Sequence, residues 1–297
     1  MNEAALYHHA SALQRRDAKK IFEECMKRMQ WRADGCDRLI DIGSGPGSVL
    51  MEFVYPLLPH KFEAMWGTDL SEPMMDFACK NYGNTERTHF EVLDIACTQL
   101  PQHLRGQFDH VTSSYCLHWV KDQKCALQNI HQLLRYSGGD CLLVFLASNP
   151  FFDVYIELSK TEKWGRYMIG AMHGISPFHN SDDPGAEYSK LLQEAGFVDF
   201  SVEVRKNIFV YEGTQNLKDN VKAVSSFMER IPEIQHEEFL NDFVKALINM
   251  KMCEGEINAS NFKFIKPYTL FVVYARKPSE FLSSLNAATN KMAKRLD

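Results

Sequence analysis

Arg38-Leu-Ile-Asp-Ile-Gly-Ser-Gly-Pro-Gly47 is the stretch of sequence that decides the fold of this chain. Its apolar first half is typical of a buried strand. The glycines at positions 43, 45 and 47 allow the backbone to turn tightly and to approach a ligand closely. A helix is expected to follow from Ser48 to about residue 58, with its N-terminal amides at the same point. The stretch therefore predicts a strand, a ligand-binding loop and a helix.

Further apolar runs follow this loop, and three of them end in an acidic or small polar residue, at Asp69, Asp94 and Ser114. Strands are expected at about 38–43, 63–69, 88–93, 107–114, 139–147, 199–210 and 269–275, with helices between most of them. In an open α/β sheet, ligands bind beyond the carboxyl ends of the parallel strands. Asp69 is placed there to accept hydrogen bonds from both hydroxyls of a ribose.

The order and spacing of these motifs resemble those of class I S-adenosylmethionine-dependent methyltransferases. The motifs are Asp41 to Gly47, Asp69 to Ala78, Asp94-Ile95, Phe108-Asp109 with Leu117-His-Trp119, and Leu133 to Gly139. With Gln14 and Arg15-Arg-Asp17, the chain is more narrowly similar to insect juvenile hormone acid O-methyltransferases over most of its length. The resemblance implies an α/β fold: a Rossmann-like, mostly parallel seven-stranded sheet flanked by helices, with helical insertions capping the active site.

The same resemblance implies that the cofactor is S-adenosyl-L-methionine, which leaves as S-adenosyl-L-homocysteine. Asp94 is then expected at the adenine amino group, and the glycine loop at the aminocarboxypropyl end. The expected cofactor-binding residues are Asp41, Gly43, Gly45, Asp69, Leu70, Asp94, Ile95 and Ser114. No metal is expected, since the chain shows no Cys/His ligand spacing.

Methyl transfer to a carboxylate needs no general base, because a carboxyl group with a pKa of about 4.3 is already ionised at neutral pH. Gln14 and Trp119 carry N–H groups that can hold a carboxylate without adding positive charge. The resemblance implies this catalytic positioning role for both. It also implies that the product is a methyl ester of farnesoic acid or juvenile hormone acid, made late in juvenile hormone biosynthesis. Further substrate-pocket candidates, for which a purely structural role stays open, are Tyr115, His118, Phe151 and Met172.

The chain is expected to form a single domain over residues 1–297, with an N-terminal helical cover at 1–30. Two segments look like insertions, 148–184 and 213–266, and the first is rich in aromatic residues and methionine. Such a composition suits an apolar, adaptable pocket, although ordinary packing of helices on the sheet would produce it too.

Composition narrows the class of partner. The 297 residues carry a net charge of −5 without a large basic cluster, so a nucleic-acid partner is not expected and an apolar small-molecule acid is. The eight cysteines include no Cys-x-x-Cys pair, and no apolar run is long enough to span a membrane. We therefore expect a cytoplasmic protein, either monomeric or homodimeric.

Three alternative functions stay open. An enzyme that methylates a small polyacid of the trans-aconitate type should have several arginines in its pocket, but segment 148–184 offers only Arg166. An NAD-dependent oxidoreductase is disfavoured because Ser48 stands at the third glycine position of the dinucleotide fingerprint. A non-catalytic S-adenosylmethionine-binding protein would keep Asp69 but lack a grip on a substrate.

Overall fold

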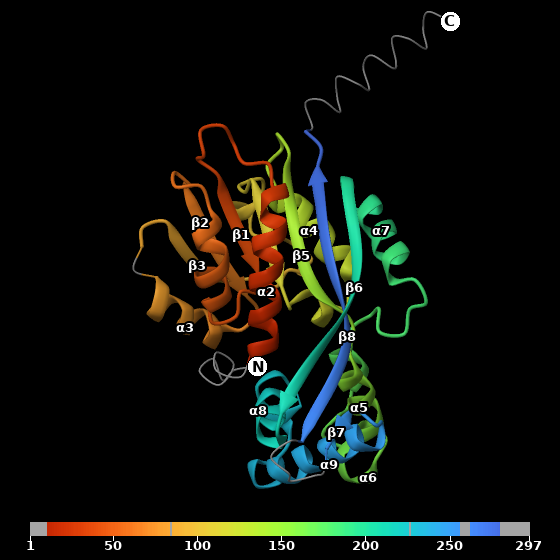
Figure 1. The fold of residues 1–297 in the computed structure, drawn as a ribbon. Coiled ribbons are helices and arrows are strands. Elements are labelled where there is room, and N and C mark those ends of the chain that lie inside the picture. Colours follow the sequence, from red (N-terminus) through yellow and green to blue (C-terminus); the bar gives the residue numbers. More distant parts are fainter. Residues whose placement is uncertain (1–10, 84, 226, 256–261, 280–297) are drawn as a thin grey trace, which may run out of the picture.

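A computed structural model describes residues 11–83, 85–225, 227–255 and 262–279 (Figure 1). A mixed sheet forms its centre, with the strand order β3-β2-β1-β4-β5-β8-β6 and a short β7 paired to β8. The strands β3, β2, β1, β4 and β5 are parallel neighbours, and β8 runs antiparallel to β5 and β6. The strands are β1 (Arg38–Ile42), β2 (Ala64–Asp69), β3 (Thr88–Val92), β4 (His110–Ser114), β5 (Gly139–Ser148), β6 (Val198–Glu212), β7 (Cys253–Glu254) and β8 (Lys263–Lys277).

The expected mostly parallel α/β sheet is confirmed, with two differences. The described residues include an eighth strand, the two-residue β7. The last strand is also longer than the expected 269–275, because β8 begins at Lys263 and so overlaps the segment 213–266. Lysines and Pro267 interrupt the apolar pattern there, yet Pro267 lies opposite Ile208 in a continuous ladder with β6. The partner strand keeps this stretch extended.

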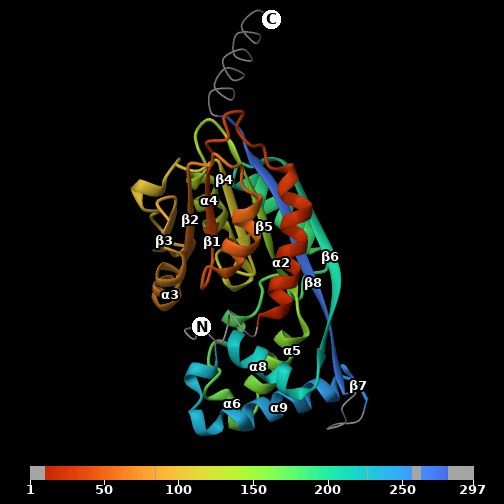
Figure 2. The same ribbon diagram turned by 60° about the vertical axis from the view of Figure 1, so that its left-hand side comes forward.

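Helices cover both faces of the sheet (Figures 1 and 2). Leu142 and Val144 of β5 belong to one hydrophobic cluster and Leu143 and Phe145 to another, as expected for alternate sides of a strand. The α-helices are α2 (Ala12–Cys25), α3 (Glu72–Tyr82), α4 (Gln123–Leu133), α5 (Pro150–Ser159), α6 (Glu162–Gly165), α7 (Pro184–Glu194), α8 (Thr214–Val224) and α9 (His236–Asn249). The expected helix after the glycine loop is present as a π-helical turn, Leu50–Val54, followed by a 3₁₀ turn, Tyr55–Leu57.

The helices α5, α6, α8 and α9 form a lobe below the sheet, which we call the cap (Figures 1 and 2). The strands β6 and β8 extend beyond the sheet as a two-stranded ribbon that reaches this lobe. Phe151 of α5 packs edge-on against Phe243 of α9, with ring centroids 5.2 Å apart. The Trp164 indole donates a hydrogen bond to Asp242 at 3.0 Å. Residues from the two expected insertions therefore share one hydrophobic core.

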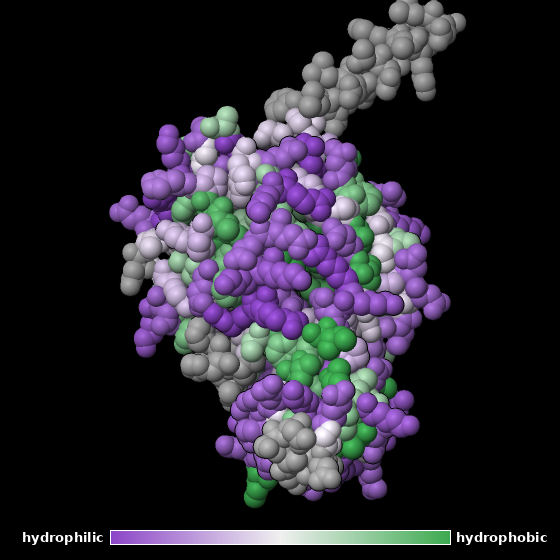
Figure 3. All heavy atoms as spheres, in the orientation of Figure 1, coloured by the Kyte–Doolittle hydropathy of each residue, from purple (hydrophilic) through white to green (hydrophobic). Residues whose placement is uncertain are grey.

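The expected N-terminal cover is described from residue 11 onward, and residues 1–10 lie outside the described part. Helix α2 lies in front of the sheet in Figure 1, in a predominantly hydrophilic region of the surface shown in Figure 3. Its inner side buries Leu13, Ile21 and Phe22, so the helix is a packed part of the domain. No helix among the described residues has the length and apolarity needed to cross a membrane.

Candidate active site

The glycine loop leaves β1 at the carboxyl edge of the sheet. Gly43 and Gly45 have φ angles of 71° and 55°, in the left-handed region that side chains disfavour. A Cβ atom at Gly43 would lie 2.3 Å from the Cβ and Sγ atoms of Cys116, whereas one at Gly45 would meet nothing within 4 Å. Gly43 is therefore required for packing, and the backbone at Gly45 is open to the space beside it.

A cavity lies between this loop and the next strand ends, and we call it the loop cavity. Asp69 accepts hydrogen bonds from the backbone N–H groups of Gly45 at 3.0 Å and Ser71 at 2.9 Å, which holds its carboxylate at the rim. Burial raises the pKa of Asp69 above its usual value. Of the expected cofactor-binding residues, the structure brings six into this lining: Gly43, Gly45, Asp69, Leu70, Asp94 and Ile95.

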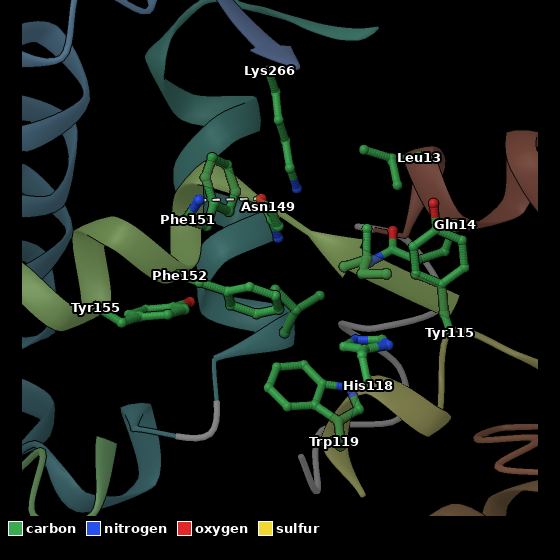
Figure 4. A pocket seen from close by; sticks show the side chains of 12 residues that line it. Leu13, Gln14, Tyr115, His118, Trp119, Asn149, Phe151, Phe152, Tyr155 and Lys266 are labelled. Carbon is green, nitrogen blue, oxygen red and sulfur yellow. Dashed lines mark hydrogen bonds between the residues drawn. The ribbon is translucent and has the colours of Figure 1, made fainter. Parts of the chain in front are cut away.

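A second cavity lies between α2, the loop after β4 and the cap, and we call it the aromatic cavity (Figure 4). It is narrow, with a volume of about 30 Å³. Tyr115 and Trp119 line both cavities. The expected substrate residues Gln14, Tyr115, His118, Trp119 and Phe151 all line the aromatic cavity.

Three polar side-chain atoms of residues that line the aromatic cavity have no hydrogen-bond partner among the described residues. They are Gln14 Oε1, His118 Nδ1 and the Tyr155 hydroxyl oxygen, and all three are buried. Buried polar atoms are nearly always paired in folded proteins, so such atoms point to a bound group or water. Burial lowers the pKa of His118 to about 3. His118 is therefore neutral at physiological pH and too weakly basic to serve as an effective general base.

Tyr115 joins the two cavities and is held firmly. Its φ angle is 54°, an uncommon conformation for a tyrosine, and its hydroxyl donates a hydrogen bond to Asp17 Oδ2 at 2.7 Å. Tyr268 of β8 donates to the same carboxylate oxygen. The shared wall of the cavities is therefore fastened to both α2 and β8.

Comparison with known proteins assigns this arrangement to a family. A model described as "Methyltransferase domain" matches residues 40–140. The juvenile hormone acid O-methyltransferase of Drosophila melanogaster is 53% identical over 96% of this chain and 95% of its own length. The protein of the same name from Bombyx mori is 39% identical over 93% and 98%, respectively. This chain belongs to the juvenile hormone acid O-methyltransferase family.

Solved structures agree on the fold of this methyltransferase. The YcgJ protein from Bacillus subtilis has a TM-score of 0.56 and 15% identity, covering 87% of this chain and 98% of its own. A candidate methyltransferase from Bacillus halodurans has a TM-score of 0.56 and 18% identity, covering 87% and 99%. The sequence resemblance to the methyltransferases is thus confirmed, and the oxidoreductase alternative is not favoured.

Three expected site residues of the methyltransferase lie outside both cavity linings. Asp41 is turned into the sheet, where Thr112 Oγ1 of β4 donates a hydrogen bond to it at 2.7 Å, and burial raises its pKa to about 7. Ser114 ends β4 without lining either cavity. Met172 lies near the cap with 58% of its surface exposed. A binding role for these three residues stays a prediction.

Lys266 lines the aromatic cavity, and sequence reasoning missed it. Only 6% of its surface is exposed, because it lies on the same side of β8 as the buried Phe264 and Tyr268, and the residues between them lie on the other side. That alternation was the available signal. The neighbouring Lys263 and Pro267 concealed it, since they made this stretch resemble the end of a solvated connection.

Proposed function

We propose that this enzyme transfers the methyl group of S-adenosyl-L-methionine to the carboxylate of an apolar sesquiterpenoid acid, such as farnesoic acid or juvenile hormone acid. The observation that carries the proposal is the shared wall of Tyr115 and Trp119 between the loop cavity and the aromatic cavity. A donor in one cavity and an acceptor in the other would meet at this wall. The names of the insect relatives agree with this chemistry.

The loop cavity suits S-adenosylmethionine, which when bound supplies an electrophilic methyl group. The open backbone at Gly45 permits close approach of the aminocarboxypropyl end. Asp69 offers two carboxylate oxygens at the end of β2 for the ribose hydroxyls. Asp94 is exposed at the rim, where its carboxylate can accept a hydrogen bond from the adenine amino group.

The aromatic cavity suits the acid. Gln14 and Trp119 hold N–H donors in its wall, and Phe151, Phe152 and Tyr155 exclude water. A carboxylate held there needs no general base, so the residues act by orientation and desolvation. No arginine occurs among the described residues that line this cavity, which disfavours a small polyacid as the substrate.

Labelled methyl donor tests the proposal. The purified protein is incubated with it and with farnesoic acid, juvenile hormone acid, trans-aconitic acid or a fatty acid, and extracted esters are counted. We expect label in the sesquiterpenoid esters. Label mainly in aconitate ester would support the polyacid alternative, and cofactor binding without any product would support a binding protein.

The proposal retains a cytoplasmic location and leaves the choice between monomer and homodimer open.

Replacing Asp69 by alanine should weaken binding of S-adenosylhomocysteine at least tenfold. The variant removes the acceptor for the ribose hydroxyls, and hydrogen bonds to a charged group contribute about 1.5–3 kcal/mol each. Isothermal titration measures the change, with Asp76→Ala, an exposed position on α3, as the control. Equal affinity of the Asp69 variant and the wild type would remove this residue from the site.

Gln14→Ala and Trp119→Phe should each lower kcat/KM for the acid about 10- to 150-fold, because each removes one donor to a charged group. Affinity for S-adenosylhomocysteine should stay within a few-fold for Gln14→Ala, since Gln14 lines only the aromatic cavity. Trp119 lines both, so its replacement by another aromatic residue keeps most of the shared wall. Wild-type turnover in both variants would show that another residue holds the carboxylate.

A further inference from the structure

Lys266 is a buried cation without an anionic partner in the part of the chain that the structure describes. Its closest aromatic neighbour is Phe151, whose ring centroid lies 3.9 Å from Nζ, and Tyr211 lies at 6.0 Å. No carboxylate of the described residues is within 4.0 Å, and none of their atoms accepts a hydrogen bond from Nζ. A buried charge is stable only when it is paired and hydrogen-bonded.

Asp17, the carboxylate whose charge acts on Lys266, is already occupied. Asp17 accepts hydrogen bonds from Tyr115, from Tyr268 and from the Arg16 guanidinium at 3.0 Å. Its charge favours the charged form of Lys266 from a distance, but burial has the larger effect and lowers the pKa of Lys266 to about 7. The neutral and the protonated lysine are therefore both populated near neutral pH when no ligand is bound.

The position of Lys266 places it within reach of a bound acid. In Figure 4, its side chain extends from β8 toward the space beside Leu13, Asn149 and Phe151. Gln14 and Trp119 line the same narrow cavity. His118, which adjoins Trp119, also lines this cavity, and its pKa is lowered by burial and to a smaller extent by the charge of Lys266.

We propose that Lys266 pairs with the substrate carboxylate in the aromatic cavity, an inference that rests on the proposed methylation of an apolar acid. A carboxylate buried alone among aromatic rings would take up a proton and lose its nucleophilicity, as buried carboxyl groups generally do. Pairing with the lysine keeps the acid ionised, while Gln14 and Trp119 orient it. Lys266 thus supplies the charge that these neutral donors lack.

Methylation also ends this interaction. The carboxylate oxygen forms a bond to the methyl carbon as the carbon–sulfur bond of the sulfonium breaks, so the product is a neutral ester and the sulfur becomes a neutral thioether. The ester carries no charge to pair with Lys266. The lysine therefore distinguishes substrate from product, which favours release of the ester.

The pairing predicts uptake of a proton when the acid binds above pH 7. Binding raises the pKa of Lys266, so the neutral fraction of the lysine must be protonated. Burial raises the pKa of the tyrosines that face the cavity or Lys266 and lowers the pKa of His118, so these groups keep their charge between pH 6 and 8.5. They are Tyr115, Tyr155, Tyr211 and His118. The carboxylate of Asp17, whose charge also acts on Lys266, is held by hydrogen bonds from Arg16, Tyr115 and Tyr268.

Titration calorimetry tests the proposal. A fifteen-carbon isoprenoid acid is titrated at pH 8 into the protein saturated with S-adenosylhomocysteine, in phosphate and in Tris, whose ionisation enthalpies differ. We expect net proton uptake when the acid binds, since burial lowers the pKa of Lys266 to about 7 and leaves most of the lysine neutral at pH 8. The primary alcohol of the same chain should bind without proton uptake. Equal uptake for acid and alcohol, or none for the acid, would overturn the pairing without a variant being needed.

Variants give a second measurement. Lys266→Met should weaken acid binding about 10- to 100-fold at pH 6 and leave alcohol binding unchanged. In the wild type, acid affinity should fall about tenfold per pH unit above pH 7, whereas Lys266→Arg should bind independently of pH up to 9. Lys263→Met, at an exposed position on the same strand, should match the wild type. Wild-type acid affinity and pH dependence in Lys266→Met would refute the pairing.

Two outcomes separate the role of Lys266 from the proposed reaction. If the wild type makes labelled ester but binds the acid without proton uptake, the methyltransferase function stands and only the role of Lys266 falls. If the acid binds with proton uptake but no ester forms with labelled donor, the pairing stands and the proposed reaction falls.

Discussion

We expect kcat/KM for methyl ester formation to rise at least tenfold for each isoprene unit added, from five to ten to fifteen carbons. Each buried methylene contributes about 0.8 kcal/mol, so five fully buried carbons set a ceiling near 1000-fold per unit. The wall that would bury them includes Phe151, Phe152 and Tyr155 of α5. Steady-state rates with the three acids measure the profile.

The five-carbon acid is the internal control, because it has the same carboxylate and differs only in its apolar chain. The aromatic cavity has a volume of about 30 Å³, which is smaller than a sesquiterpenoid acid, so we expect side chains of its lining to move when the acid enters. A flat profile, or a preference for a tricarboxylate, would contradict the sesquiterpenoid assignment while leaving the methyltransferase family intact.

Gly43→Ala should lower the free energy of unfolding by about 2–5 kcal/mol. A side chain in the left-handed region costs about 1–2 kcal/mol, and overpacking against the Cys116 side chain adds about 1–3 kcal/mol. Urea unfolding of the cofactor-free protein measures the change. A variant as stable as the wild type would show that the loop does not need glycine at this position.

Gly45→Ala is the matched control for Gly43→Ala. It has a similar backbone conformation but no atom within 4 Å of the new Cβ, so only the cost of about 1–2 kcal/mol for the left-handed region should appear. Because this Cβ would project into open space at the loop cavity, cofactor affinity should fall even though the fold persists. The pair thus separates the packing role of one glycine from the ligand-facing role of the other.

The order of strands along the chain and the cluster of residues at their carboxyl ends could be predicted from local patterns. Apolar runs that end in Asp69 or Asp94 need no tertiary information, and the structure brings both residues to one cavity. Gln14 and Trp119 were also expected at one site, and they line one cavity although they are distant in sequence. Their expectation depended on resemblance, because no local pattern relates a residue of α2 to one that follows β4.

Other residues could not be placed, because their surroundings depend on which strands become neighbours. Asp41 shares the strand-end position of Asp69, but the pairing of β1 with β4 brings Thr112 beside it and turns its carboxylate inward. The residues on either side of Lys266 in the sequence are typical of a solvent-exposed segment. Only the crossing of β8 between α2 and the cap buries it.

The ribbon of β6 and β8 connects two parts of the enzyme in which mutations have different effects. The glycine loop and Asp69 belong to the sheet, whereas Phe151, Phe152 and Tyr155 belong to a lobe that hangs from its edge. Mutations in that lobe can reshape the space for the acid without touching the donor half of the molecule. Related enzymes can therefore differ in the acid that they methylate while they keep the same glycine loop and Asp69.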